Sequence, residues 1–223
     1  MTTKAVILDV DHTLVMSRVD FSEMKRRIID YLKSRDIPIK ESYVNRATYE
    51  IIADVVEYLK REGRGGEVNP TLDDLGEIMT EVELRSVHDI SEIEGARKTL
   101  EELKRRGIRI GVLTRGSRSY VTQVLTSTRL RDYIDVMGAR DDCDKPKPDP
   151  TQVFLLMEKM GVNKEETIMV GDHPSDAICA RNAGVRFVGV LTGSWGRDLT
   201  SQLGSTVIKT IADLPVFLDH EAS

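Results

Sequence analysis

The 223-residue sequence is poor in cysteine and in aromatic residues, and it has no hydrophobic run of the length that spans a membrane. Two cysteines, Cys143 and Cys179, are too few for a disulfide framework, and we interpret both as reduced thiols. The amino terminus lacks the charged and apolar regions of a secretory signal. These absences predict a cytoplasmic protein without a membrane anchor.

An excess of positive charge is also absent. The formal net charge is −5 and the isoelectric point is near 5.5, whereas general binding to nucleic acid or to an anionic membrane requires a basic surface. The 40% hydrophobic and 31% charged content is typical of a folded globular chain. We therefore expect a protein that binds neither nucleic acid nor membranes. The sequence does not indicate its oligomeric state.

What the sequence does contain is an alternation of short apolar runs with helical patterns. Five runs are interpreted as strands, at residues 5–8, 108–113, 134–137, 167–170 and 187–191. Helical stripes between them end at glycines, which are common just past helix ends. Strands that alternate with helices imply a mostly parallel sheet with helices on both faces. We therefore predict a Rossmann-like α/β core.

Residues 16–93 show helical periodicity instead of this alternation. Three apolar stripes recur at helix spacing: Phe21, Met24, Ile28, Tyr31 and Leu32; Val44, Ala47, Ile51, Val55, Tyr58 and Leu59; and Leu72, Leu75, Ile78, Met79 and Val82. A glycine-rich segment, residues 61–66, ends the second helix and lets the chain turn. We expect an α/β core of residues 1–15 and 94–223 with an inserted all-helical cap of residues 16–93.

Two aspartates follow the first predicted strand directly. Asp9 and Asp11 stand one residue apart, with Thr13 two residues further on. Open α/β sheets bind their ligands at the carboxyl ends of the strands, so this spacing predicts two carboxylates at that edge. Aspartate is also common in turns, and by itself the pair fits a solvated strand end equally well.

Later strands are followed by chemistry-bearing residues as well. Thr114 follows the second predicted strand, Lys145 lies in a proline-rich loop, and Asp172 and Asp176 follow the fourth. Each has a simpler interpretation: Thr114 as a helix N-cap, Lys145 as a solvated lysine, and the two aspartates as helix N-terminal residues. Three prolines stiffen the loop around Lys145, which suits a lysine that is held in place.

In this order and spacing, the four segments resemble the haloacid dehalogenase-like hydrolase superfamily. The resemblance is closest to its phosphatase branch with a small helical cap, which includes phosphoglycolate phosphatase-like proteins. It extends from Val6 to about Leu191 and is weakest in the predicted cap. Each segment alone is a weak signal, whereas the four in order are a specific one.

The resemblance implies roles for individual residues. It makes Asp9 the nucleophile and Asp11 the general acid and then base. It implies phosphate binding by Thr114, Arg115 and Lys145. It also implies a Mg²⁺ ion held by Asp9, the backbone carbonyl of Asp11, Asp172, and Asp176 either directly or through water.

Physical chemistry is consistent with these roles. A carboxylate nucleophile divides phosphate-ester hydrolysis into two easier steps. Carboxylates at 4 Å repel one another by about 4 kcal/mol at an effective dielectric of about 20, so a cation is needed among four of them. Oxygen ligands favour Mg²⁺ over zinc, since no histidine or cysteine pair has ligand spacing. His12 and His173 are interpreted as neighbours of the site, with His12 a candidate contact for substrate.

We predict a Mg²⁺-dependent phosphomonoesterase that acts on a small, phosphoglycolate-like metabolite through an aspartyl-phosphate. Asp11 favours phosphoryl transfer because dehalogenases of the superfamily lack the second aspartate. Two alternatives remain: a phosphomutase, which keeps both aspartates, and a catalytically silent protein that binds phosphate ligands. The cap lysines are interpreted as solvated rather than imine-forming. Candidate contacts to the leaving group are the arginines Arg18, Arg46 and Arg64.

Overall fold

The computed structural model describes residues 2–193, 195 and 206–222, which form two compact units. The first unit is Met1–Arg18 with Val87–Ser223, and the second is Val19–Ser86. The sequence predicted that the core leaves off at residue 15 and resumes at residue 94. In the structure the first unit continues to residue 18 and resumes at residue 87. The reason is a small antiparallel pair, β2 (Val15–Met16) with β3 (Ser91–Glu92), which fastens both connecting segments to the core.

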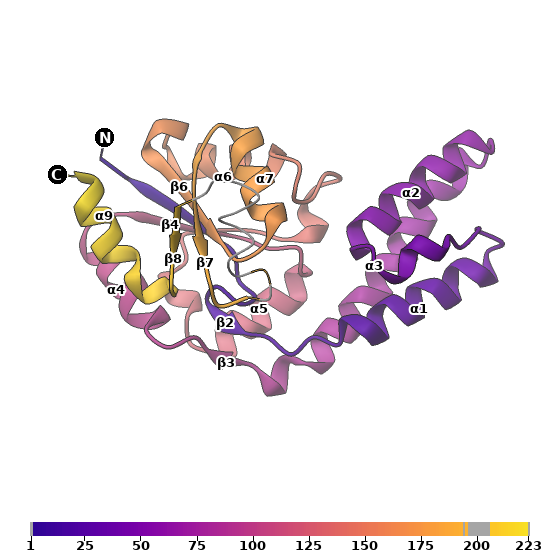
Figure 1. The fold of residues 1–223 in the computed structure, drawn as a ribbon, viewed down its shortest axis with the longest axis horizontal. Coiled ribbons are helices and arrows are strands. Elements are labelled where there is room, and N and C mark those ends of the chain that lie inside the picture. Colours follow the sequence, from indigo (N-terminus) through magenta and orange to yellow (C-terminus); the bar gives the residue numbers. More distant parts are fainter. Residues whose placement is uncertain (1, 194, 196–205, 223) are drawn as a thin grey trace. The chain divides into compact units, whose positions relative to one another are not determined.

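The first unit contains a six-stranded parallel sheet in the order β5-β4-β1-β6-β7-β8 (Figure 1). Its strands are β1 (Ala5–Leu8), β4 (Arg109–Leu113), β5 (Val136–Gly138), β6 (Thr167–Gly171), β7 (Arg186–Val190) and β8 (Thr206–Ile208). The five predicted strands are confirmed. The edge strand β8 was missed because it is short and half exposed, without an apolar run.

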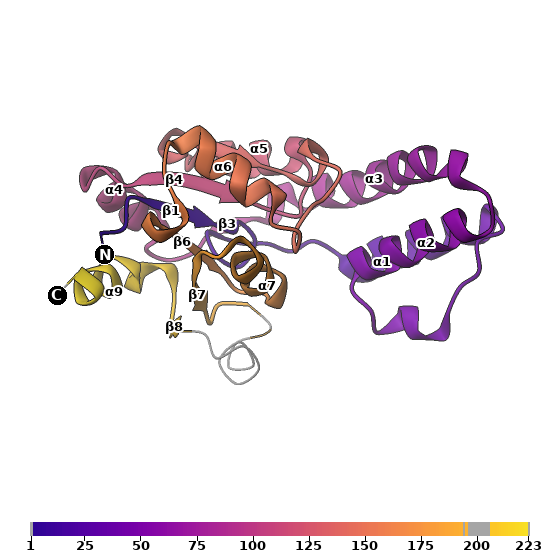
Figure 2. The ribbon, with the colours of Figure 1, turned by 90° about the horizontal axis from the view of Figure 1, so that it is seen from above.

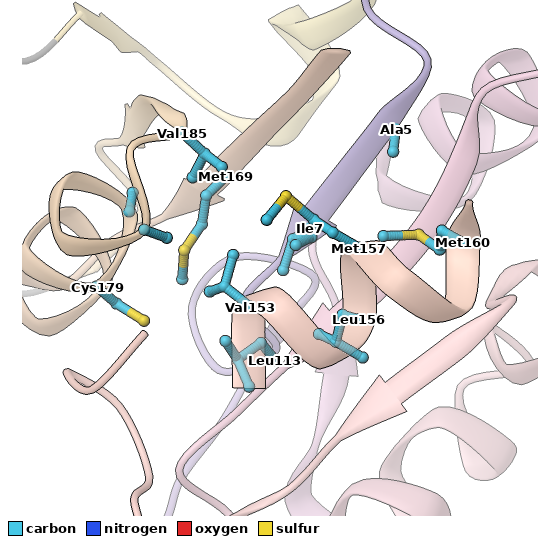
Figure 3. Close-up of a cluster of buried hydrophobic side chains, with 12 residues drawn as sticks. Ala5, Ile7, Leu113, Val153, Leu156, Met157, Met160, Met169, Cys179 and Val185 are labelled. Atoms are coloured by element: carbon cyan, nitrogen blue, oxygen red, sulfur yellow. The ribbon is translucent and has the colours of Figure 1, made fainter. Parts of the chain in front are cut away.

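Helices cover both faces of this sheet. They are α4 (Ala96–Arg105), α5 (Arg118–Ser127), α6 (Thr151–Met160), α7 (Pro174–Ala183) and α9 (Leu214–Ala222). Side chains of α6 and α7 form a buried cluster with Ala5 and Ile7 of β1 (Figure 3). Val6 and Leu8 point to the opposite face and are also fully buried. The predicted α/β architecture is therefore confirmed, and β1 lies at its centre with Asp9 directly after it.

The second unit consists of α1 (Phe21–Ser34), α2 (Thr48–Arg61) and α3 (Val68–Arg85), and both α1 and α2 pack on α3 (Figure 2). Met24, Ile28 and Leu32 of the first predicted stripe are buried. The ends of the stripes are not: Phe21, Val44 and Leu72 are exposed side chains. Each predicted stripe thus included one exposed residue. In the third stripe, the buried residue at that end is Thr71 and not its neighbour Leu72.

None of the helices in the part of the chain that the structure describes is both long enough and apolar enough to cross a bilayer.

Candidate functional site

Three buried carboxylates meet where β1 and β6 end. Asp9 follows β1, and its amide donates to the Val170 carbonyl of the neighbouring strand over 2.9 Å. Asp172 follows β6, and Asp176 lies in the first turn of α7. Carboxylate oxygens of Asp9, Asp172 and Asp176 lie within 4.8 Å of one another. The parallel pairing of β1 with β6 is what brings segments 163 residues apart in sequence (172 minus 9) to one point.

Two glycines leave room for these carboxylates. A Cβ atom on Gly171 would overlap the carboxylate of Asp176, and one on Gly193 would overlap that of Asp172. The turn into α7 holds Asp176 as well, since the His173 amide donates to its Oδ2 over 3.1 Å. Any side chain at either glycine would therefore displace an acidic group of the cluster.

The lysine of this cluster is Lys147. Its Nζ donates to Asp9 Oδ1 over 2.5 Å and to Asp176 Oδ1 over 2.7 Å, and only 1% of the residue is exposed. This corrects the expectation that Lys145 faces the site. Lys145 is exposed, and its amide donates to the Cys143 sulfur over 3.2 Å. Both lysines precede a proline in the same stiff loop, so the sequence offers two equivalent candidates and only the path of the loop distinguishes them.

The charges of the cluster do not balance. Burial raises the pKa of Asp9 to about 7, although the positive charge of Lys147 acts to lower it. The negative charges of Asp176 and Asp11 raise this pKa further. Burial also raises the pKa of Asp172 to about 8, assisted by repulsion from Asp9 and Asp176. Burial acts to lower the pKa of Lys147, but the attraction of Asp176 and Asp9 outweighs it and the pKa is raised. One lysine therefore leaves excess negative charge among oxygen donors.

This donor set fits a hard divalent cation. Mg²⁺ prefers oxygen ligands and is commonly bound by one or two carboxylates together with water and phosphate oxygens. The three clustered residues supply carboxylate oxygens alone, without the sulfur or imidazole ligands typical of structural zinc sites. The carboxylate of Asp11 is not part of the group.

We expect the metal-free protein to lose thermal stability as the pH rises from about 5 to about 8. In that range Asp9 and Asp172, with pKa values raised from 3.8 to about 7 and about 8, hold more protons in the folded than in the unfolded state. Stability then falls with increasing pH, because the folded state must release protons and expose buried negative charge. Thermal unfolding in EDTA and in millimolar Mg²⁺ would measure this, with a larger Mg²⁺ shift at pH 8 than at pH 5.5.

The variant Asp172→Asn is the control, since it removes one of the two titrating groups. It should show a smaller pH-dependent loss and a smaller Mg²⁺ shift. A melting temperature that rises across this window in EDTA, or a Mg²⁺ shift equal at both pH values, would contradict the expectation.

Asp11 lies in a tight loop beside the cluster. His12 has a φ of 58°, and its amide donates to the Val15 carbonyl over 2.6 Å, which turns the chain back after Asp11. The Thr192 hydroxyl, from the loop after β7, donates to the His12 carbonyl. The Asp11 carboxylate is half-buried and accepts a hydrogen bond from the Tyr120 hydroxyl over 2.6 Å. The backbone of His12 thus shapes this loop, while a substrate contact of its side chain stays a prediction.

Thr114 and Arg115 follow β4, the other neighbour of β1. Thr114 is buried and its Oγ1 accepts from the Gly116 amide over 2.9 Å. It is not the N-cap of α5, because Ser117 has that role. Burial, and next the charge of Arg115, lower the pKa of His173, the residue after Asp172, to about 4.

Other residues that the sequence singled out have structural partners. Arg64 donates to both carboxylate oxygens of Glu67 and to the Arg35 carbonyl, and Arg46 pairs with Asp54 at 2.5 Å. Both arginines thus stabilise the second unit, and Arg18 is exposed.

Cys143 and Cys179 are free thiols. Burial raises the pKa of Cys179 to about 12, so this thiol is not a nucleophile at neutral pH.

The parallel sheet and the acidic cluster at its carboxyl edge define a doubly wound α/β protein with a buried anionic site. Comparison with known protein families identifies the family within this class of α/β proteins. A model described as haloacid dehalogenase-like hydrolase matches residues 6–190, and the chain belongs to this family.

Proteins similar to this chain include some named phosphoglycolate phosphatase and some named pyrophosphatase. The chain is 37% identical over 105 residues to the pyrophosphatase PpaX of Bacillus velezensis, a match that covers 46% of this chain and 49% of that protein. It is 26% identical over 228 residues to phosphoglycolate phosphatase 1 of Pseudomonas aeruginosa, covering 98% of this chain and 81% of that protein. The first match thus spans about half the length of the relative, and the second spans most of it.

Solved structures share the fold. A hydrolase from Pseudomonas syringae superposes with a TM-score of 0.73 at 24% identity, covering 99% of this chain and 100% of that chain. CbbY from Rhodobacter sphaeroides, solved in complex with phosphate, superposes with a TM-score of 0.65 at 20% identity, covering 98% and 100%. These likenesses concern the architecture of the chain.

Proposed function

We propose that this protein is a Mg²⁺-dependent phosphomonoesterase that acts through an aspartyl-phosphate on Asp9. The observation that carries the proposal is the contact of Lys147 with Asp9 in a buried group of three carboxylates. A lysine at this place holds the nucleophile and offsets the charge of a phosphoryl group beside it. Membership of the hydrolase family and the phosphatase names of relatives support the same activity.

The chemistry assigned to the chain has two steps. An oxygen of Asp9 attacks phosphorus while the ester P–O bond breaks, and protonated Asp11 gives its proton to the leaving oxygen. Asp11, now a carboxylate, takes a proton from the water that attacks the aspartyl-phosphate. Inorganic phosphate leaves and the Asp9 carboxylate is restored. Asp11 is suited to both proton transfers because it is half-buried and held beside the cluster rather than within it.

The remaining residues stabilise charge. Lys147 stays beside Asp9 in both steps, and we assign Thr114 and Arg115 to the oxygens of the phosphoryl group, since they follow the strand that neighbours β1. Bound through Asp9, Asp172, the Asp11 carbonyl and Asp176, Mg²⁺ would supply Lewis-acid neutralisation of that group. In this assignment Asp176 keeps its contact with Lys147. Asp176 would hold the cation either directly or through water.

For the substrate we propose a small phosphorylated metabolite of the phosphoglycolate type. The support is the phosphoglycolate phosphatase of Pseudomonas aeruginosa, which matches over nearly the whole chain. In this proposal the second unit is the cap domain. A panel of phosphorylated acids, sugars and nucleotides, with released phosphate as readout, would rank these classes.

Hydrolysis of p-nitrophenyl phosphate tests the activity itself. We expect release of p-nitrophenolate in Mg²⁺ and loss of nearly all of it in excess EDTA, with recovery when Mg²⁺ is returned. A buffer with Ca²⁺ in place of Mg²⁺ is the control for general ionic effects, since Ca²⁺ takes more ligands at longer distances. Hydrolysis that is insensitive to EDTA would contradict the metal assignment. No hydrolysis across the whole panel would favour a binding protein or a phosphomutase.

A further inference from the structure

A buried tyrosine hydroxyl reaches the side chain of Asp11. Tyr120 Oη donates to Asp11 Oδ1 over 2.6 Å, across 109 positions of sequence. Tyr120 is fully buried, whereas Asp11 is half-buried and stands outside the three-carboxylate group. The hydrogen bond therefore joins a fully buried side chain to the carboxylate of Asp11 and restricts its orientation.

The tyrosine is itself held on both sides. It lies in the first turn of α5, where the Tyr120 amide donates to Oγ of the N-cap Ser117 over 3.3 Å. Its ring lies so close to Gly116 that a Cβ atom there would be 2.6 Å from the ring carbon Cδ1. Gly116 follows Thr114 and Arg115, so one short segment both carries the phosphate-binding candidates and fixes the tyrosine.

We propose that Tyr120 is a positioning residue that orients Asp11 for proton transfer. This assignment rests on the proposed phosphatase activity. Tyr120 occupies Oδ1 of Asp11, which leaves Oδ2 to give its proton to the leaving oxygen and later to take one from the attacking water. The phenol keeps its own proton throughout. Without it, Asp11 would spend less time in the productive orientation, and steps that need its proton would slow.

A pair of substrates of similar shape tests this assignment. Phenyl phosphate needs a proton at its leaving oxygen more than p-nitrophenyl phosphate does, because nitrophenolate is a much weaker base. For Tyr120→Phe we expect kcat/KM to fall about tenfold to hundredfold on phenyl phosphate, the range for one lost hydrogen bond to a charged group. On p-nitrophenyl phosphate we expect a loss below about threefold, with the Mg²⁺ dependence unchanged.

Tyr133→Phe is the matched control. Its hydroxyl donates to Glu101 over 2.8 Å, away from the carboxylate cluster, so its removal should leave both substrates within about twofold of wild type. A double-mutant cycle adds a second readout: in an Asp11→Asn background, Tyr120→Phe should cost no further activity, since the group that it orients is absent.

Outcomes that overturn the assignment are distinct from those that overturn the activity. Equal losses on both substrates, no loss on phenyl phosphate, or a further tenfold loss in the Asp11→Asn background would each show that Tyr120 does not act through Asp11. A wild-type protein that hydrolyses neither substrate in Mg²⁺ would overturn the phosphatase proposal, and this assignment with it.

Discussion

Replacing Lys147 by methionine is expected to lower kcat/KM by at least about 10²-fold, because the transition state loses a preorganised positive charge. The same change leaves Asp9 and Asp176 without their buried ion-pair partner, which typically costs about 3–5 kcal/mol. Methionine matches the length of the lysine stem, so the loss reflects charge rather than a cavity. Turnover of p-nitrophenyl phosphate and thermal unfolding, each with and without Mg²⁺, would measure the two effects.

Lys145→Met is the matched control, since it makes the same chemical change two positions away on an exposed side chain. We expect activity within about twofold of wild type and stability within about 0.5 kcal/mol. Mg²⁺ should restore part of the stability of Lys147→Met by supplying positive charge to the same carboxylates. A greater loss of activity in Lys145→Met than in Lys147→Met would show that the lysine of the site is misassigned.

Asp9→Asn is expected to lower turnover by at least about 10⁴-fold, because an amide oxygen is a poor nucleophile and no other carboxylate replaces it. The fold should survive. Burial raises the pKa of Asp9 to about 7, so at pH 8 the wild-type protein without metal bears the cost of a buried charge that asparagine lacks. We therefore expect the variant in EDTA at pH 8 to melt no lower than the wild type.

Phosphate release and thermal unfolding of the same preparations would check both expectations. Asp132→Asn provides the control, because Asp132 is an exposed carboxylate in the short helical turn Arg131–Tyr133. It should retain wild-type turnover. Activity of Asp9→Asn within tenfold of wild type would remove Asp9 from the nucleophile role, and an unfolded variant would show that Asp9 is needed for the structure instead.

Periodicity along the chain determined the architecture. A run such as residues 167–170 is apolar throughout, because a central parallel strand is covered on both faces, and the structure places β6 there. Stripes at helix spacing likewise located α1, α2 and α3. Two elements were missed: β8 has only three residues, and α9 begins with a continuous apolar run rather than a stripe at helix spacing.

The residues of the site likewise fall into two groups, those that the sequence predicted and those that it did not. Carboxylates that directly follow adjacent strands were predictable, because the parallel sheet brings strand ends together and fixes the placement of Asp9 and Asp172. Residues that reach the site from loops and helices were not. Only the path of their shared loop places Lys147 rather than Lys145 against Asp9. Tyr120 contacts Asp11 because the start of α5 lies beside the loop that follows β1.

The amino-acid sequence by itself therefore determined five of the six strands of the sheet, the helical insertion and the acidic strand ends, since these depend on local periodicity and on residues next to one another. Tertiary structure decided which lysine is buried against Asp9, which hydroxyl holds Asp11, and where glycine is required for the Asp172 and Asp176 carboxylates. These depend on distances between segments that are far apart in the chain, and no local pattern of side chains specifies such distances.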